Sequence, residues 1–117
     1  MDLVLASYEL AKAFPVDERY GLTAQLRRAA VSIPGNIAEG HGRRHTGDYV
    51  RHLSIANGSL LELETHVHIA LRLGYVSGHA VDEVSGLAAR VGQMLARLIA
   101  KLELKRPGSR VPGPGPR

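Results

Sequence analysis

Two long periodic stretches, residues 47–73 and 78–105, place the strongest limit on how this chain can fold. Along both of them apolar residues recur at spacings of three and four. In the second stretch these residues are Val81, Val84, Ala88, Val91, Leu95, Leu98 and Leu102. This spacing gathers the apolar side chains on one face of a helix, as in the seam of a coiled coil. The two stretches are therefore predicted to be helices that pack through these faces.

Two further segments, residues 3–14 and 22–39, also have helical periodicity. The first is expected to stop before Pro15, whereas Pro34 lies inside the second. An interior proline removes one backbone hydrogen bond and crowds the preceding turn. Because the apolar pattern keeps its phase across Pro34, we expect a kink in this helix and not a break.

The connections between the four segments are short and carry helix-terminating residues. Thr46 and Ser77 are predicted to cap the starts of the third and fourth helices, and Gly74 is predicted to end the third. Short connections make neighbouring helices antiparallel. The sequence thus predicts an all-α fold, an antiparallel up-down-up-down four-helix bundle with a kinked second helix.

The first helix is predicted to be much shorter than the last two. At ~1.5 Å per residue, each of the last two is about 40 Å long, and residues 3–14 span less than half of that. Part of the groove between the longer helices would therefore be uncovered. Either another subunit fills this gap, or residues upstream of Met1 do.

The composition fits a single bundle and excludes several classes of protein. The 117 residues suffice for one core, over residues 1–106, and Pro and Gly dominate a tail over residues 107–117 that we expect to be disordered. The absence of cysteine excludes a disulfide framework, a thiolate zinc site and a cysteine nucleophile. It also fits a reducing cytosol, so we expect a cytoplasmic protein. No stretch has the ~20 apolar residues that a membrane span needs, and no signal peptide is evident.

Basic residues gather in two places, both predicted to contact nucleic-acid phosphates. The first place is the junction of the second and third helices, and the second is one face of the fourth helix. The predicted residues are Arg27, Arg43, Arg44 and Arg51 in the first, and Arg90, Arg97, Lys101 and Lys105 in the second. Phosphate backbones require such clusters, and without aromatic residues for stacking the binding would not depend on sequence. Ordinary solubilising charge is the alternative.

The glycines at this junction allow two interpretations. Gly40 and Gly42, followed by Arg43 and Arg44, could cradle a phosphate with backbone N–H groups and positive charge. However, no strand precedes the loop, and the Lys-Ser/Thr pair of a Walker motif is missing. The favoured interpretation is structural: Gly40 ends the second helix in a left-handed conformation, and Gly42 forms the turn.

Four polar residues beside the apolar faces form a second candidate site. They are Arg28 and Glu39 on the second helix and Asn57 and Glu64 on the third. An acid/base site is one interpretation, but no nucleophile with a placed base accompanies them. We favour a partly buried polar network that sets the packing register or the contacts between subunits.

The histidines give little support to a metal site. His45, Asp48 and His52 recur at i, i+3 and i+7 and could bind zinc if a fourth ligand joined them. A solvated polar face is the favoured alternative, and we expect neither a metal nor a cofactor. His66 and His68 follow Glu62 and Glu64 by four residues, which predicts two ion pairs along the helix.

A large part of the chain, residues 18–77, resembles a known family. The shared residues are Gly21-Leu22-Thr23, Arg27-Arg28-Ala29, Ser32-Ile33-Pro34, Asn36-Ile37-Ala38-Glu39-Gly40, Gly42-Arg43, Gly58-Ser59-Leu60, Glu62-Leu63-Glu64-Thr65 and Gly74-Tyr75. This pattern closely resembles the bacterial four-helix bundle proteins, also known as 23S rRNA intervening-sequence proteins. The resemblance implies a bundle that assembles into a homopentameric ring. Some members are accessory proteins of diversity-generating retroelements, which implies DNA or RNA and a reverse transcriptase as partners.

Together these features predict a protein without enzymatic activity. We expect a homo-oligomeric scaffold or adaptor that binds DNA or RNA through its basic surfaces, with no membrane association. The main alternative is a protein–protein interaction module with no nucleic-acid role, and an enzyme is the third.

Overall fold

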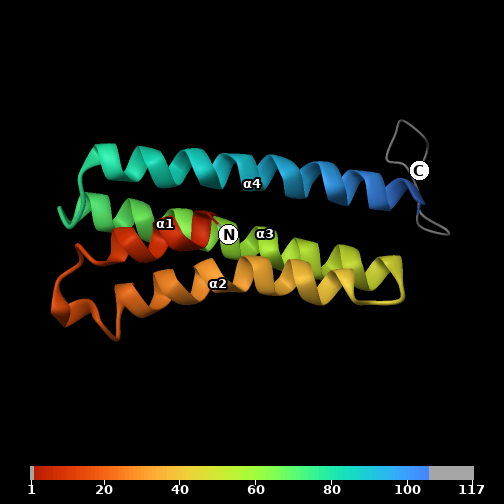
Figure 1. Ribbon diagram of the computed structural model, residues 1–117, viewed down its shortest axis with the longest axis horizontal. Helices are drawn as coiled ribbons and strands as arrows, with labels where there is room; N and C mark the ends of the chain where they lie inside the picture. The colour runs from red at the N-terminus through yellow and green to blue at the C-terminus, as the bar shows by residue number, and fades with distance from the viewer. Residues whose placement is uncertain (1, 106–117) are drawn as a thin grey trace, which may run out of the picture.

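The computed structural model describes residues 2–105, and every regular element within them is helical. The elements are α1 (Asp2–Ala11), the 3₁₀ turn η1 (Val16–Glu18), α2 (Leu22–His41), α3 (Thr46–Arg72) and α4 (Gly78–Lys105). Successive helices run in opposite directions (Figure 1). This confirms the predicted antiparallel four-helix bundle. The predicted tail, residues 107–117, lies outside the described residues.

The predicted end of α3 and start of α4 are confirmed. Gly74 follows α3 with φ +80°, a left-handed conformation that glycine adopts without a steric penalty. The backbone N–H of Ala80 donates a hydrogen bond to the Ser77 hydroxyl at 3.2 Å, so Ser77 caps α4. The predicted cap of α3 is wrong, because Thr46 is the first residue of the helix. His45 holds the cap position without a side-chain hydrogen bond.

The other two helices also differ slightly from the prediction. α1 ends at Ala11, and the chain continues to Phe14 through i→i+3 hydrogen bonds, because Pro15 disfavours helical geometry just before it. α2 runs without interruption through Pro34. That continuity was predicted from the phase of the apolar pattern and is confirmed, while the bend at Pro34 stays a prediction.

Gly40 has a different role from the predicted one. It lies inside α2 and has no positive φ, so it does not end the helix in a left-handed conformation. A Cβ at this position would lie 2.8 Å from the His52 Cβ and 2.9 Å from the Tyr49 Cδ1. Glycine is required because α2 and α3 approach each other closely here, and that approach could not be recognised from the local sequence.

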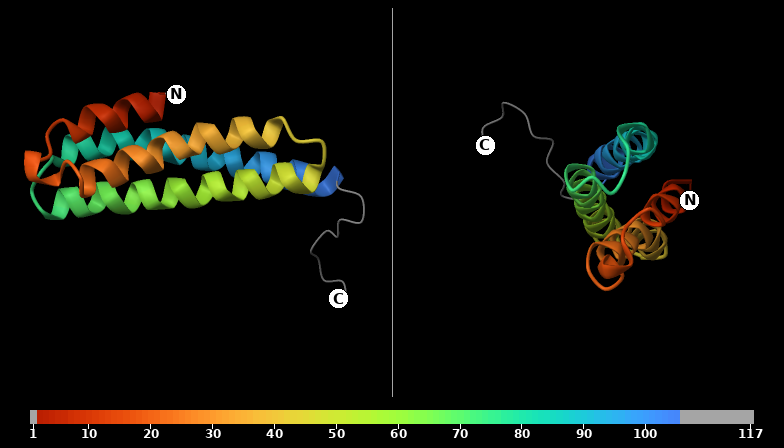
Figure 2. Two further views of the ribbon diagram at one scale, coloured as in Figure 1. Left: turned by 90° about the horizontal axis from the view of Figure 1, so that it is seen from below. Right: turned by 90° about the vertical axis from the view of Figure 1, so that its left-hand side faces the viewer.

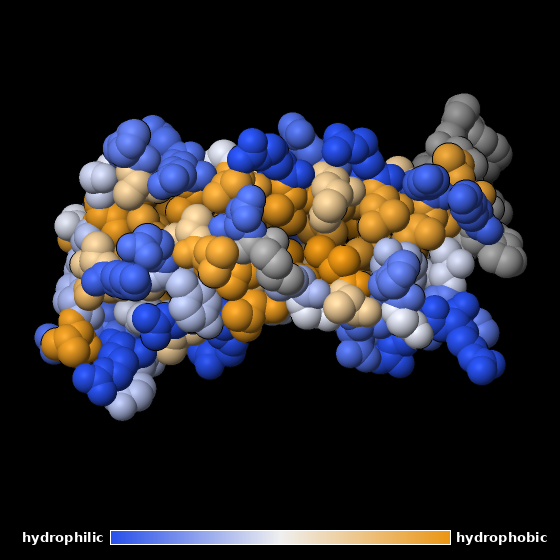
Figure 3. All heavy atoms as spheres, in the orientation of Figure 1, coloured by the Kyte–Doolittle hydropathy of each residue, from blue (hydrophilic) through white to orange (hydrophobic). Residues whose placement is uncertain are grey.

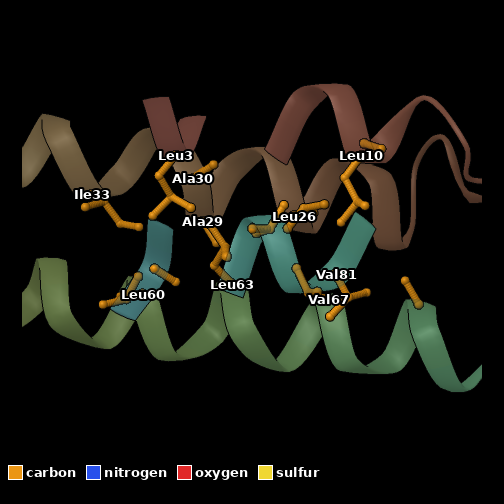
Figure 4. Packing of buried hydrophobic residues seen from close by; sticks show 14 of the residues in the cluster. Leu3, Leu10, Leu26, Ala29, Ala30, Ile33, Leu60, Leu63, Val67 and Val81 are labelled. Atoms are coloured by element: carbon orange, nitrogen blue, oxygen red, sulfur yellow. The ribbon is translucent and has the colours of Figure 1, made fainter. Parts of the chain in front are cut away.

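The core follows the apolar faces that the sequence predicted. Leu26, Leu53, Leu63 and Leu95, from α2, α3 and α4, are completely buried. Figure 4 shows side chains of α1, α2, α3 and α4 converging on one another in this core. Each fully buried leucine contributes about 1.5–3 kcal/mol relative to an exposed one. Within residues 2–105, no helix combines the length and the apolar character needed to cross a membrane.

α1 covers only one half of the bundle. Seen end on, it occupies the corner opposite α3, between α2 and α4 (Figure 2). With 10 residues against 27 in α3, it leaves the other half of this corner uncovered. No Cα of α2 lies within 8 Å of a Cα of α4, so these two helices do not close the gap themselves. The first helix is short, as predicted from the sequence. Part of the groove between the longer helices is therefore uncovered, which was also predicted.

The uncovered half exposes apolar side chains. In Figure 3 an apolar band continues between α4 and α2 past the start of α1. Half-buried residues at this end of the three long helices include Ile37, Tyr49, Leu98 and Leu102. We call this surface the open groove.

At the opposite end of the bundle, the Glu18 carboxylate links two parts of the chain by hydrogen bonds. Glu18 accepts hydrogen bonds from the Leu22 backbone N–H at 3.0 Å and from the Tyr75 hydroxyl at 2.8 Å. It therefore caps α2 and ties it to the connection between α3 and α4. The hydrogen bond from Leu22, together with that from Tyr75, lowers the pKa of Glu18, and the same carboxylate raises the pKa of Tyr75.

The close approach at Gly40 can be tested with a matched pair of variants. Gly40→Ala should lower the free energy of unfolding by about 1–3 kcal/mol, because its methyl group overlaps α3. Gly35→Ala, in the same helix, has no atom within 4 Å of the new Cβ and should be neutral or stabilising by up to about 1 kcal/mol. Urea denaturation measures both. Equal stability of the two variants would contradict the assigned role of Gly40.

Candidate nucleic-acid interface

The fold brings residues of both predicted basic clusters, which lie far apart in the sequence, to the same end of the bundle. Because α3 and α4 are antiparallel, the start of α3 is level with the end of α4, and the α2–α3 turn lies at the same end (Figure 1). The exposed basic residues there are Arg43, Arg44, Arg51, Arg97, Lys101 and Lys105. We call this set the basic end. It is the largest group of the predicted phosphate-binding residues that the fold brings together.

Two of the predicted phosphate-binding residues lie away from the basic end. The Arg27 guanidinium stacks over the Tyr8 ring, 5.2 Å from its centroid, and its Nε is buried without a hydrogen-bond partner. Arg27 therefore holds α1 against α2. Arg90 borders a shallow depression beside Asp2 and Leu3, at the start of α1. Six of the eight predicted residues thus lie together at the basic end, and their contact with phosphates stays a prediction.

One ion pair lies within the basic end. The Arg43 guanidinium is 2.6 Å from the Glu39 carboxylate, and both side chains are about half exposed. An exposed pair of this kind contributes only about 0–1 kcal/mol. A phosphate could therefore replace Glu39 as the partner of Arg43 at little cost.

Among the described residues, no aromatic rings form a stacking platform at the basic end. Tyr49, the tyrosine at this end, is half buried, and its ring meets the His41 ring edge-on with 5.7 Å between centroids. Tyr20 is 86 % exposed, which the sequence did not reveal, but it lies before α2 at the other end of the bundle. Contacts at the basic end would therefore be made mainly with phosphates and not with bases.

A line of hydrogen-bonded polar residues crosses the contact between α2 and α3. The Asn36 Nδ2 donates to the Ser32 carbonyl at 2.9 Å and lies 3.0 Å from the Ser32 hydroxyl. The two hydroxyls of Ser32 and Ser59 are 2.7 Å apart, and the Asn36 Oδ1 is 3.2 Å from the His52 Nδ1. We call these four residues the polar seam. Sequence analysis had no signal for His52 and Ser59 in this role except their spacing of seven residues, which places them on one face.

The hydrogen bonds of the seam place a hydrogen on the Nδ1 of the His52 ring. Because the Asn36 amide nitrogen donates to Ser32, its oxygen is left to accept from the His52 Nδ1–H. In a neutral imidazole the lone pair is then on Nε2, which is buried without a partner. Within an otherwise apolar contact, these polar atoms form hydrogen bonds with one another instead of with water.

The four residues of the predicted polar network are placed apart. Glu39 pairs with Arg43 at the basic end, and Arg28 lies beside Ser32 on the surface of α2. Asn57 and Glu64 are half buried on α3. Over residues 2–105, no hydrogen bond or ion pair links any two of these four. The polar seam lies between α2 and α3, where we expected the predicted network.

The histidines have separate surroundings. His45 is exposed at the start of α3, whereas the His52 ring faces Asn36 inside the seam. The described part of the chain contains no group of three His, Asp or Glu side chains placed to hold a metal ion. The predicted ion pairs of His66 and His68 with the glutamates four residues earlier do not form there. For His66 the reason is that its Nδ1 is turned into the protein.

Comparison with known proteins assigns the family. The family described as 23S rRNA-intervening sequence protein matches residues 1–97, most of the chain. The chain belongs to this family. The resemblance found in residues 18–77 is therefore confirmed, and the match extends to α1 and most of α4. A search of curated proteins finds no match.

A solved structure supports the fold of this 23S rRNA-intervening sequence family member. It is the crystal structure of a protein of unknown function from the S23 ribosomal protein family of Bacteroides thetaiotaomicron. The two chains superpose with a TM-score of 0.73 at 22 % sequence identity, over 84 % of this chain and 95 % of the other. At this identity the similarity shows the shared fold alone.

The polar seam can be tested by removing Asn36. Asn36→Ala leaves His52 with both ring nitrogens buried and unpaired, so it should lower the free energy of unfolding by about 1–3 kcal/mol. Asn57→Ala removes an asparagine that is half buried and makes no side-chain hydrogen bond within residues 2–105. This control should change stability by less than about 1 kcal/mol. A similar loss in both variants, measured by urea denaturation, would contradict the role of the seam.

Proposed function

We propose that this protein is a non-enzymatic, homo-oligomeric scaffold of the cytoplasm that binds nucleic acid through its basic end. The observation that supports this most directly is the meeting of six exposed basic residues, from the α2–α3 turn, α3 and α4, at one end of the bundle. The acidic residues at the same end are Glu39, Asp48 and Glu103, so positive charge is in excess. Neutralising phosphates with Arg and Lys releases counterions and drives association.

The surface favours binding without sequence preference. Arginine and lysine that contact phosphates position a protein on nucleic acid but do not read bases. The half-buried Tyr49 offers little ring surface for stacking. The proposal therefore predicts similar affinity for different sequences, and it does not distinguish DNA from RNA.

The open groove supports self-association. It exposes apolar side chains along the half of the corner that α1 leaves uncovered, and contiguous apolar surface of this kind marks interaction sites. A second copy of the chain is the proposed occupant. We propose a pentamer, as the resemblance to the family implies, which would present the basic end five times. A reverse transcriptase is a further proposed partner, and a protein–protein module without a nucleic-acid role is the alternative.

The nucleic-acid proposal is tested by charge removal at the basic end. Arg43→Ala combined with Arg44→Ala should weaken binding to any duplex. It should also reduce the slope of log affinity against log salt by about one for each lost phosphate contact. Fluorescence anisotropy with two unrelated duplexes, over a series of salt concentrations, measures both effects.

The control for this experiment removes the same charge from the other end. Arg19→Ala combined with Arg72→Ala deletes two exposed arginines at the opposite end of the bundle, before α2 and at the end of α3, and should leave affinity within about twofold. An equal effect of both double variants would rule out the basic end as the site. No binding by the unmodified protein at low salt would favour the alternative without nucleic acid.

Self-association is tested by light scattering over a micromolar dilution series. The expected mass is about five times the 12.6 kDa of one chain. Leu102→Gln, in the open groove, should lower the mass, whereas Leu73→Gln, exposed at the other end of α3, should not. Circular dichroism checks that both variants remain helical. A mass of one chain at every concentration would overturn the proposal.

A further inference from the structure

A small depression between α2 and α3 gathers polar groups that do not satisfy one another. Its volume is about 250 Å³. The polar residues that line it are Gln25, Arg28, Ser32, Ser59, Glu62 and His66. We call it the polar notch. It is distinct from the basic end, because Arg28 lies 16 residues before Arg44, about 24 Å along a helix.

The two serines leave one hydroxyl hydrogen without an acceptor. The Ser32 oxygen is 3.0 Å from the Asn36 Nδ2, which donates to it, and 2.7 Å from the Ser59 oxygen. One of the two hydroxyl hydrogens is used between the serines. No other acceptor for the second is found within residues 2–105, although Ser59 is only 7 % exposed. A polar hydrogen at the floor of the notch is therefore available to a ligand.

The walls of the notch add a positive charge and further donors. Within the described residues Arg28 forms no ion pair, and the Gln25 amide makes no hydrogen bond. The His66 Nδ1 is buried without a partner, and a buried polar atom in this state is costly. Glu62 opposes an anion, but its side chain is exposed, and solvent weakens the repulsion.

We propose that the polar notch binds a small oxyanion, a phosphate or a carboxylate. Arg28 supplies the charge and a planar set of donors that matches both groups. The serine pair and Gln25 supply neutral donors from the floor and the wall. The volume suits a single anionic group and not a nucleotide, so this site is separate from the proposed binding of nucleic acid and does not depend on it.

The test follows the His66 imidazole signals by NMR in the full chain. Inorganic phosphate is added in one titration and acetate in the other, at constant pH and ionic strength. Saturable shifts of the His66 signals are expected with at least one of the two anions. Phosphate alone would identify the source as a phosphorylated or free phosphate ligand, and acetate alone would identify a carboxylate ligand.

Two variants and a control decide whether the notch is responsible. Arg28→Gln should weaken binding about tenfold or more, because a charged hydrogen bond is lost. Glu62→Gln should strengthen it by about twofold or more, since a repelling charge is removed. Arg72→Gln, on exposed α3 surface outside the notch, should have no effect. Non-saturable shifts, or equal affinity in Arg28→Gln and Arg72→Gln, would overturn the proposal, provided that circular dichroism shows both variants folded.

Discussion

The packing of α2 against α3 is the contact on which the rest of the structure depends. It is close because Gly40 lets the backbone of α2 approach Tyr49 and His52, where any Cβ would overlap. The contact is specific because Asn36 and Ser32 need polar partners on α3, and a shift of one helix along the other would leave them unpaired. A purely apolar contact would allow such a shift. α4 packs on α3, and α1 packs on both α2 and α4.

The proposed function follows from the register of this pair. The α2–α3 turn follows Gly40 at one end of the bundle, and the antiparallel α4 brings Lys101 and Lys105 to the same end. The open groove lies beyond the start of α1, where only α2, α3 and α4 are present. Charge and exposed apolar surface are therefore found at the same end of the molecule.

Sequence analysis was most successful where a pattern repeats. The 3-4 spacing predicted α4 with its observed bounds, and Ser77 and Gly74 were placed correctly because capping depends on neighbouring residues alone. It failed at Gly40, where the requirement for glycine comes from a helix that lies elsewhere in the sequence. It also placed Arg27 with the phosphate-binding residues, because its stacking on Tyr8 depends on where α1 packs.

The fold class, the order and approximate lengths of the helices, the short first helix and the family could all be predicted from the sequence. These depend on periodicity and on local signals, which are properties of neighbouring residues. Only the tertiary structure decided which polar residues meet. Asn36 pairs with His52 rather than acting within a network of Arg28 and Glu39, and six residues of the two basic clusters lie at one end of the bundle. The physical reason is that contacts between helices depend on their rotation and axial register, which the packing of side chains across the interface sets.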